Sequence, residues 1–144
     1  MFRLGLPALL AATLFTPGCH SGVKVVPVTG KVLIDGQVLT HGKVQIAPEG
    51  SRPAFAEIGP DGTFTFSTYG DADGVAVGTH KAAVIAHETL GPSRTRWHAP
   101  KRYISTDTSG LTVTIAEPRT DLVINLTWKD SGRTGPYEVS QEKE

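Results

Sequence analysis

Polar and hydrophobic side chains alternate along much of the chain between residues 28 and 126, as they do in half-buried β-strands. In "VTGKVLID" (28–35), Val28, Gly30, Val32 and Ile34 are expected on one face and the intervening residues on the other. Further strands are predicted over GKVQIAPE (42–49), AFAEIG (54–59), TFTFST (63–68), THKAAVIAH (79–87), LTVTIA (111–116) and DLVINL (121–126).

Short glycine-containing segments separate these strands, as in DGQ at 35–37 and PDG at 60–62. Glycine accepts the positive φ of tight turns, and proline presets φ at the turn's second position. Strands spaced by about ten residues, without a helical period, predict an all-β fold, a seven-stranded antiparallel β-sandwich over residues 26–128. Residues 88–109 are expected to form a long connection, and the polar tail 129–144 is expected to be disordered. The predicted core positions are Val44, Ile46, Phe64, Phe66, His80, Ala82, Val84, Ala86, Leu111, Val113, Ile115, Leu122, Ile124 and Leu126.

The segments "VTGKVLIDGQVLTHGKVQIAPEG", "GPDGTFTFST" and "GVAVGTHKAAVIA" resemble the carboxypeptidase regulatory-like domain, a transthyretin-like (prealbumin-like) sandwich. Val77 stands where that family often has proline, and His80 where it often has tyrosine. The later "APKRYISTDTSGLTVTIAEPRTDLVINL" is similar to the C-terminal half of short bacterial lipoproteins built on this domain. The matching positions are turn and core positions, so the resemblance implies a fold and no chemistry. They are Gly30, Val32, Asp61, Gly62, Phe64, Phe66, Gly78 and Val84.

The N-terminal segment differs from the rest of the chain. After "MFR", residues 4–15 form an apolar run that is long enough for a signal peptide and too short to cross a bilayer as a helix. The run leads to "TPGC", which ends in Cys19, the single cysteine. This arrangement resembles a bacterial lipoprotein signal, with Gly18 as the small residue before the cut and with Thr16 and Pro17 departing from the usual pattern.

The resemblance implies a signal peptide over residues 1–18, a tether over 19–25 and acyl chains such as palmitate on Cys19. An exported protein is then expected, held by its lipid at the cell membrane or outer membrane and facing the periplasm or the exterior. Ordinary secretion with a free thiol at Cys19 is the alternative.

The charges exclude one class of partner. Fourteen Lys and Arg residues balance fourteen Asp and Glu residues, so no overall positive field attracts nucleic acid. No nucleic-acid partner is therefore predicted, and the sequence contains no motif that indicates a cofactor.

Two aspartates in "YGDADGVAVG" raise the question of calcium, which binds six to eight oxygen atoms. With Asp71 at the first position of an EF-hand loop, Ala76 stands in place of the glycine and Ala82 in place of the final glutamate. We therefore interpret the segment as a turn in which aspartate bonds nearby backbone amides.

The histidines show no metal-binding spacing. His80 and His87 are expected on opposite faces of one strand, while His20, His41 and His98 lie in the tether, a turn and the long connection. No zinc site is predicted. The chain also lacks the "Y-R-G-S" ending of the hydroxyisourate-hydrolysing branch of the transthyretin-like fold, a G-x-S-x-G elbow and a P-loop, so no enzymatic activity is predicted.

The most uneven charge distribution lies in "GPSRTRWHAPKRYIS", residues 91–105, which contains no acid. Guanidinium groups can hold carboxylates or phosphates, and exposed aromatic rings can stack on sugars, so this stretch is a candidate ligand-binding loop. The alternative is a solvated loop whose aromatic residues attach it to the sheet. The candidate residues are Arg94, Arg96, Trp97, Lys101, Arg102 and Tyr103.

Together these features predict a non-enzymatic, lipid-anchored cell-envelope protein that acts as a structural or interaction module. Its expected partners are the membrane, through the lipid, and an envelope protein or polysaccharide. The alternative is a secreted or envelope module that binds glycans or anions through residues 91–105.

Overall fold

The computed structural model describes residues 22–129 and 131–140 of the chain. The signal peptide predicted over 1–18, Cys19 and the first part of the tether lie outside the described residues. Within them, no helix is long and apolar enough to cross a membrane. The elements are β1 (Val25–Val26), β2 (Val28–Ile34), β3 (Gln37–Val38), β4 (Lys43–Ala47), β5 (Ala54–Glu57), β6 (Thr63–Thr65), β7 (Val75–Ala76), β8 (Gly78–Ile85), β9 (His87–Gly91), β10 (Arg94–Trp97), the 3-10 helix η1 (Lys101–Ile104), β11 (Leu111–Ile115), β12 (Arg119–Leu126) and β13 (Tyr137–Ser140).

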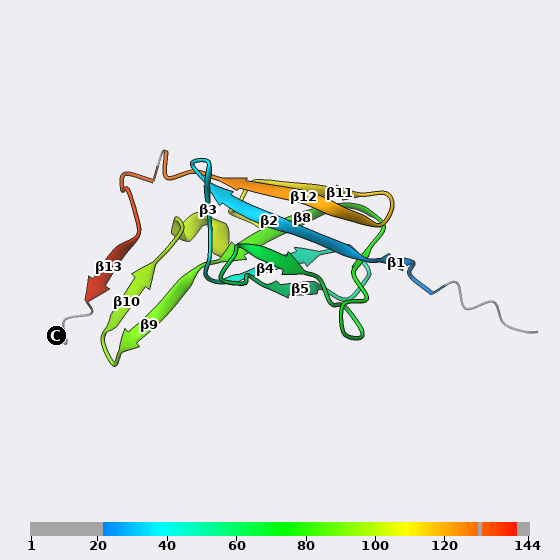
Figure 1. Cartoon of the computed structure of the whole chain (residues 1–144), viewed down its shortest axis with the longest axis horizontal. Helices are drawn as coiled ribbons and strands as arrows, with labels where there is room; N and C mark the ends of the chain where they lie inside the picture. Colours follow the sequence, from blue (N-terminus) through cyan, green and yellow to red (C-terminus); the bar gives the residue numbers. More distant parts are fainter. Residues whose placement is uncertain (1–21, 130, 141–144) are drawn as a thin grey trace, which may run out of the picture.

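Two sheets form the body of the protein, one with the strand order β11–β8–β4–β5 and the other with the order β12–β2–β3, to which β6 is added through β2 (Figure 1). Their facing side chains are the alternating hydrophobic residues of each strand, and Val32, Ile46, Phe66, Val84 and Ile115 are fully buried between them. The prediction of an all-β sandwich is therefore confirmed.

The strand pairing differs from the prediction in one respect. β12 runs parallel to β2, with Ile124 opposite Val32, whereas a fully antiparallel sandwich was predicted. Alternation shows which face of a strand is buried but not the direction of its neighbour, so the pattern could not reveal a parallel pair.

The segment expected as a long connection is largely regular. β9 and β10 form an antiparallel hairpin over 87–97, and η1 follows at 101–104. The predicted fifth strand is consequently shorter, because β8 ends at Ile85 and His87 begins β9.

The predicted disorder of the tail is wrong for residues 137–140. Tyr137–Ser140 form β13, which pairs antiparallel with β10 from Trp97↔Tyr137 to Arg94↔Ser140. The resulting sheet, β13–β10–β9, projects from one end of the sandwich, and β1 lies at the opposite end (Figure 1).

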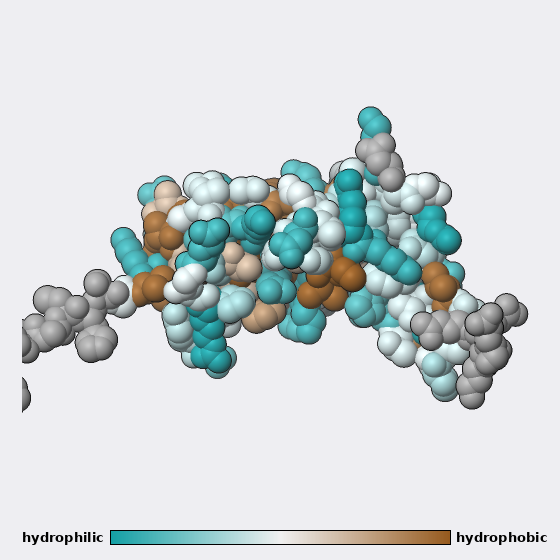
Figure 2. Space-filling model, turned by 180° about the vertical axis from the view of Figure 1, so that it is seen from behind, coloured by the Kyte–Doolittle hydropathy of each residue, from teal (hydrophilic) through white to brown (hydrophobic). Residues whose placement is uncertain are grey.

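The face of the molecule in Figure 2 is mostly hydrophilic, with only small hydrophobic areas between polar side chains.

The predicted core positions are buried, except that Leu111 and His80 are only partly buried. His80 places its Nε2 2.7 Å from the carbonyl oxygen of Ala76, which fixes the ring beside β7.

Candidate functional site

The projecting sheet has two chemically different faces because successive strand residues point to opposite sides. On one face, Arg96 of β10 lies between Glu88 of β9 and Glu138 of β13. On the other face, Trp97 lies between His87 and Tyr137. The predicted binding stretch is thus divided between a charged face and an aromatic face.

On the charged face, the arginines are already paired with acids. Arg96 donates from Nη1 to Oε1 of Glu88 at 3.0 Å, and from Nε and Nη2 to Oε1 of Glu138 at 3.1 and 2.6 Å. Arg94 Nη1 lies 3.8 Å from Oε2 of Glu138. The hydrogen bond to Glu138 and the two negative charges outweigh partial burial and raise the pKa of Arg96 above its ordinary value. Arg96 therefore links the three strands and is occupied by acids, whereas Arg94 is 57% exposed and only loosely paired with Glu138.

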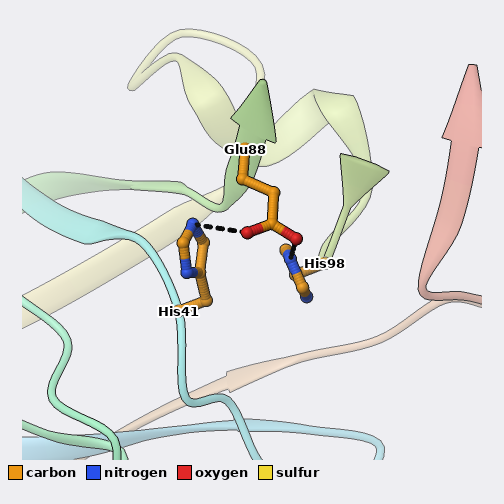
Figure 3. Close-up of side chains that lie close together, drawn as sticks. All are labelled: His41, Glu88 and His98. Carbon is orange, nitrogen blue, oxygen red and sulfur yellow. Dashed lines mark hydrogen bonds and ion pairs between the residues drawn. The ribbon is translucent and has the colours of Figure 1, made fainter. Parts of the chain in front are cut away.

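Glu88 also contacts two histidines (Figure 3). His98, directly after β10, has its Nε2 3.2 Å from Oε1 of Glu88, and His41, in the loop between β3 and β4, has its Nε2 4.0 Å from Oε2. The centroids of the two imidazole rings are 4.8 Å apart. The backbone of His98 is fixed by its amide N–H, which donates to the backbone carbonyl oxygen of Ala86 at 2.8 Å. We call His41, Glu88 and His98 the His–Glu–His cluster.

Partial burial disfavours the charged form of Glu88, but other effects outweigh it. The hydrogen bond from His98 and the positive charges of His98, His41 and Arg96 hold the pKa of the Glu88 carboxyl below its ordinary value. Glu88 is therefore a carboxylate at neutral pH, available as an acceptor or as a metal ligand.

No local spacing in the sequence indicates this cluster. Its residues come from three segments, and they meet only because the β9–β10 hairpin folds back toward the loop before β4. From the sequence, His41 is expected in a turn and His98 in the long connection, so a search for zinc-binding spacings cannot find the pair.

The other predicted site residues lie on or near the aromatic face. The Trp97 ring contacts the His87 ring at 4.9 Å, and Lys101 Nζ lies 5.0 Å above Trp97. Arg102 stacks on Tyr103 at 4.7 Å and donates to its hydroxyl at 2.6 Å.

Tyr103 has a structural position instead of a binding one. Its side chain is buried, and its hydroxyl accepts a hydrogen bond from the backbone N–H of Thr127 at 3.1 Å. It joins η1 to the end of β12 and is not accessible to a ligand.

Near Lys101 and Arg102 the surface is hollowed into a cleft of about 380 Å³, which we call the basic cleft. Arg133 stacks on Tyr137 at 4.7 Å, and Tyr137 meets Trp128 edge-on at 5.7 Å. None of the described lining residues is acidic, so the cleft combines three positive charges with two aromatic rings. It is lined by Pro100, Lys101, Arg102, Trp128, Ser131, Arg133, Tyr137 and Val139.

The aspartate-rich loop behaves as a turn. The carboxylate of Asp73 accepts hydrogen bonds from the backbone N–H groups of Thr68, Tyr69 and Gly70 at 2.7, 2.9 and 3.1 Å. The bond from Thr68, opposed by partial burial and aided by the other two, holds the pKa of Asp73 below its ordinary value. The turn interpretation is confirmed for Asp73, whose oxygens are occupied by backbone amides.

No family model matches the chain, and neither does any curated protein. Among solved structures, it is similar to the crystal structure of a DUF3823 family protein from Parabacteroides merdae ATCC 43184, with 16% sequence identity and a TM-score of 0.38. The similarity covers 74% of this chain and 46% of that one, so this chain spans less than half the length of that protein. Function must therefore be argued from the residues themselves.

Proposed function

We propose that the protein is a non-enzymatic, lipid-anchored component of the cell envelope whose sandwich carries the β13–β10–β9 sheet as an interaction surface. The supporting observation is the arrangement of the two ends. β1 starts at Val25, and the projecting sheet lies at the opposite end of the sandwich (Figure 1).

The short tether supports the same orientation. From Cys19 to Val25 the chain can reach about 20 Å at most, at roughly 3.3–3.6 Å per extended residue. A lipid on Cys19 would keep the β1 end near the membrane and leave the far sheet facing outward. The strand pattern, with its resemblance to lipoproteins built on a carboxypeptidase regulatory-like domain, also supports this proposal.

Replacing Cys19 with serine tests the anchor. We expect the parent protein in the membrane fraction, with an acylated cysteine at the start of the mature chain, and the C19S variant in the soluble fraction. Each buried methylene adds about 0.8 kcal/mol, so two or more acyl chains give a nearly complete shift. Fractionation and mass spectrometry of the N-terminal peptide measure it.

Thr16→Leu is the matched control, because it restores the usual residue three positions before the cysteine and should preserve anchoring. An unmodified Cys19 in the mature protein, or a C19S variant that stays with the membrane, would contradict the proposal.

A second candidate function, binding of acidic glycans, is favoured by the basic cleft. Lys101, Arg102 and Arg133 can neutralise carboxylate groups of a polysaccharide, while the Tyr137 ring and the edge of the largely buried Trp128 supply an apolar part of the wall. This candidate does not use Arg94 and Arg96, because both lie close to carboxylates of neighbouring strands.

We expect Lys101→Ala combined with Arg133→Ala to weaken binding of an acidic polysaccharide about tenfold or more, equivalent to about 1.4 kcal/mol. The exposed Arg52, outside the cleft, provides the control, since Arg52→Ala removes a similar charge. Binding should also fall as salt rises, because the contacts are ionic. Equal affinity for acidic and neutral polysaccharides would count against this function.

A further inference from the structure

We propose that the His–Glu–His cluster is a binding site for a divalent first-row transition-metal ion of the zinc type. His41, Glu88 and His98 each offer one ligand atom, and these atoms lie within 4.8 Å of one another. This site is separate from the basic cleft, and nothing in the proposed anchoring depends on it.

The three side chains converge from three directions. Both histidines turn Nε2 toward Glu88, whose two carboxylate oxygens each face one ring (Figure 3). In a tetrahedral site with bonds of about 2.0–2.2 Å, ligand atoms stand roughly 3.3–3.5 Å apart. The ligand atoms now lie up to 4.8 Å apart, so the widest pair must approach by roughly 1.3–1.5 Å when the ion binds. His41 is 42% exposed, so its side chain has room for that rotation.

The donor atoms select the class of metal. Two imidazole nitrogens and one carboxylate suit zinc, copper or nickel ions, whereas calcium and magnesium require mostly oxygen ligands. Three protein ligands also leave the fourth position of a tetrahedral ion open. Because the cluster is only partly buried, that position can be filled by water.

Arg96 is the charge that could oppose a metal ion. It contacts Oε1 of Glu88 at 3.0 Å, but its other two bonds, at 2.6 and 3.1 Å, are to Glu138, so its charge is shared between the two carboxylates. Oε2 of Glu88 faces His41 and is free of arginine. The carboxylate can thus bind the ion through Oε2 while Arg96 holds Oε1, the outer contact that commonly orients a ligating carboxylate.

The competing explanation is a cluster that needs no ion. A proton on the Nε2 of His98 can be shared with Glu88, and Arg96 can supply the remaining positive charge. The two explanations differ in what zinc does, because a metal ion needs the lone pair of each Nε2, whereas a cluster without an ion has no saturable affinity for zinc.

Titration of the detergent-solubilised full chain with Zn²⁺, after removal of metals by a chelator, separates them. We expect one saturable site per chain and at least tenfold weaker binding after His41→Ala or His98→Ala. His87→Ala is the matched control, since His87 lies in the same hairpin on the opposite face and should leave the affinity unchanged. No saturable binding, or equal affinity in all three variants, would overturn the site.

Cobalt provides a second readout on the parent protein, which does not depend on whether the variants fold. Co²⁺ bound by two imidazoles, a carboxylate and water should give the intense visible absorption of a four-coordinate ion, and Zn²⁺ should remove it by displacement. Ca²⁺ should not displace it. A weak spectrum like that of the aqueous cobalt ion would contradict a tetrahedral site.

Discussion

Replacement of Phe66 by alanine is expected to lower the free energy of unfolding by about 3–5 kcal/mol, a large part of the roughly 5–15 kcal/mol that stabilises a typical domain. Phe66 is the largest of the fully buried side chains, and its ring meets that of Phe64 edge-on at 5.1 Å. Alanine would remove the apolar contacts and leave a cavity between two rigid sheets, which close poorly around a void. Equilibrium unfolding in urea measures the loss.

Phe55 offers a matched control. It is a phenylalanine on β5, but its side chain is 47% exposed. Phe55→Ala should change the free energy of unfolding by no more than about 0.5 kcal/mol, as surface substitutions generally do. Similar losses in the two variants would show that the buried face has been assigned to the wrong side of the sheets.

Gly30→Ala is expected to cost about 3 kcal/mol, at the upper end for overpacking. Gly30 lies in β2 opposite Leu122 of the parallel strand β12, and a Cβ at this position would collide with the backbone carbonyl of Leu122. Backbone cannot move aside as a flexible side chain can, so relief requires separation of β2 from β12. A lowered melting temperature and faster amide exchange along β12 would measure it.

Gly70→Ala controls for the loss of glycine itself. No atom lies within 4 Å of the position where its Cβ would stand, and its φ is not in the left-handed region. This variant should be close to neutral, within about 0.5 kcal/mol. If Gly30→Ala were equally well tolerated, the close approach of β2 and β12 would be wrong.

The sequence predicts the sandwich well where one face of each strand is apolar. Phe64 and Phe66, or Leu122 and Ile124, mark the buried face through alternation, and a one-residue shift would expose them. The pattern says nothing about which strand lies beside which, so the parallel β2–β12 pair was missed.

The β9–β10 hairpin was missed for a different reason. Its strands are mostly polar on both faces, so they lack the hydrophobic period on which the strand predictions depended. A signal was nevertheless present, because "GPS" at 91–93 is a turn sequence between two short runs of polar, β-branched and aromatic residues. β13 was missed for the same reason, because it also has no buried hydrophobic face.

The candidate sites were predictable only in part. Lys101 and Arg102 of the basic stretch line the basic cleft, whereas the acids that pair with Arg94 and Arg96 come from other strands and could not be read from the stretch itself. The His–Glu–His cluster was not predictable, since its members are brought together by tertiary structure and not by a short motif.

The pairing of β13 with β10 ties the last described residues of the chain to a hairpin forty residues earlier. A protein shortened after residue 128 would lose Glu138, the main partner of Arg96. It would also lose Arg133 and Tyr137 from the wall of the basic cleft. Arg96 would then be left with Glu88 alone, a carboxylate of the proposed metal site. Proteolytic removal of the C-terminal segment would therefore take away part of the cleft wall and change the surroundings of Glu88 in a single cut.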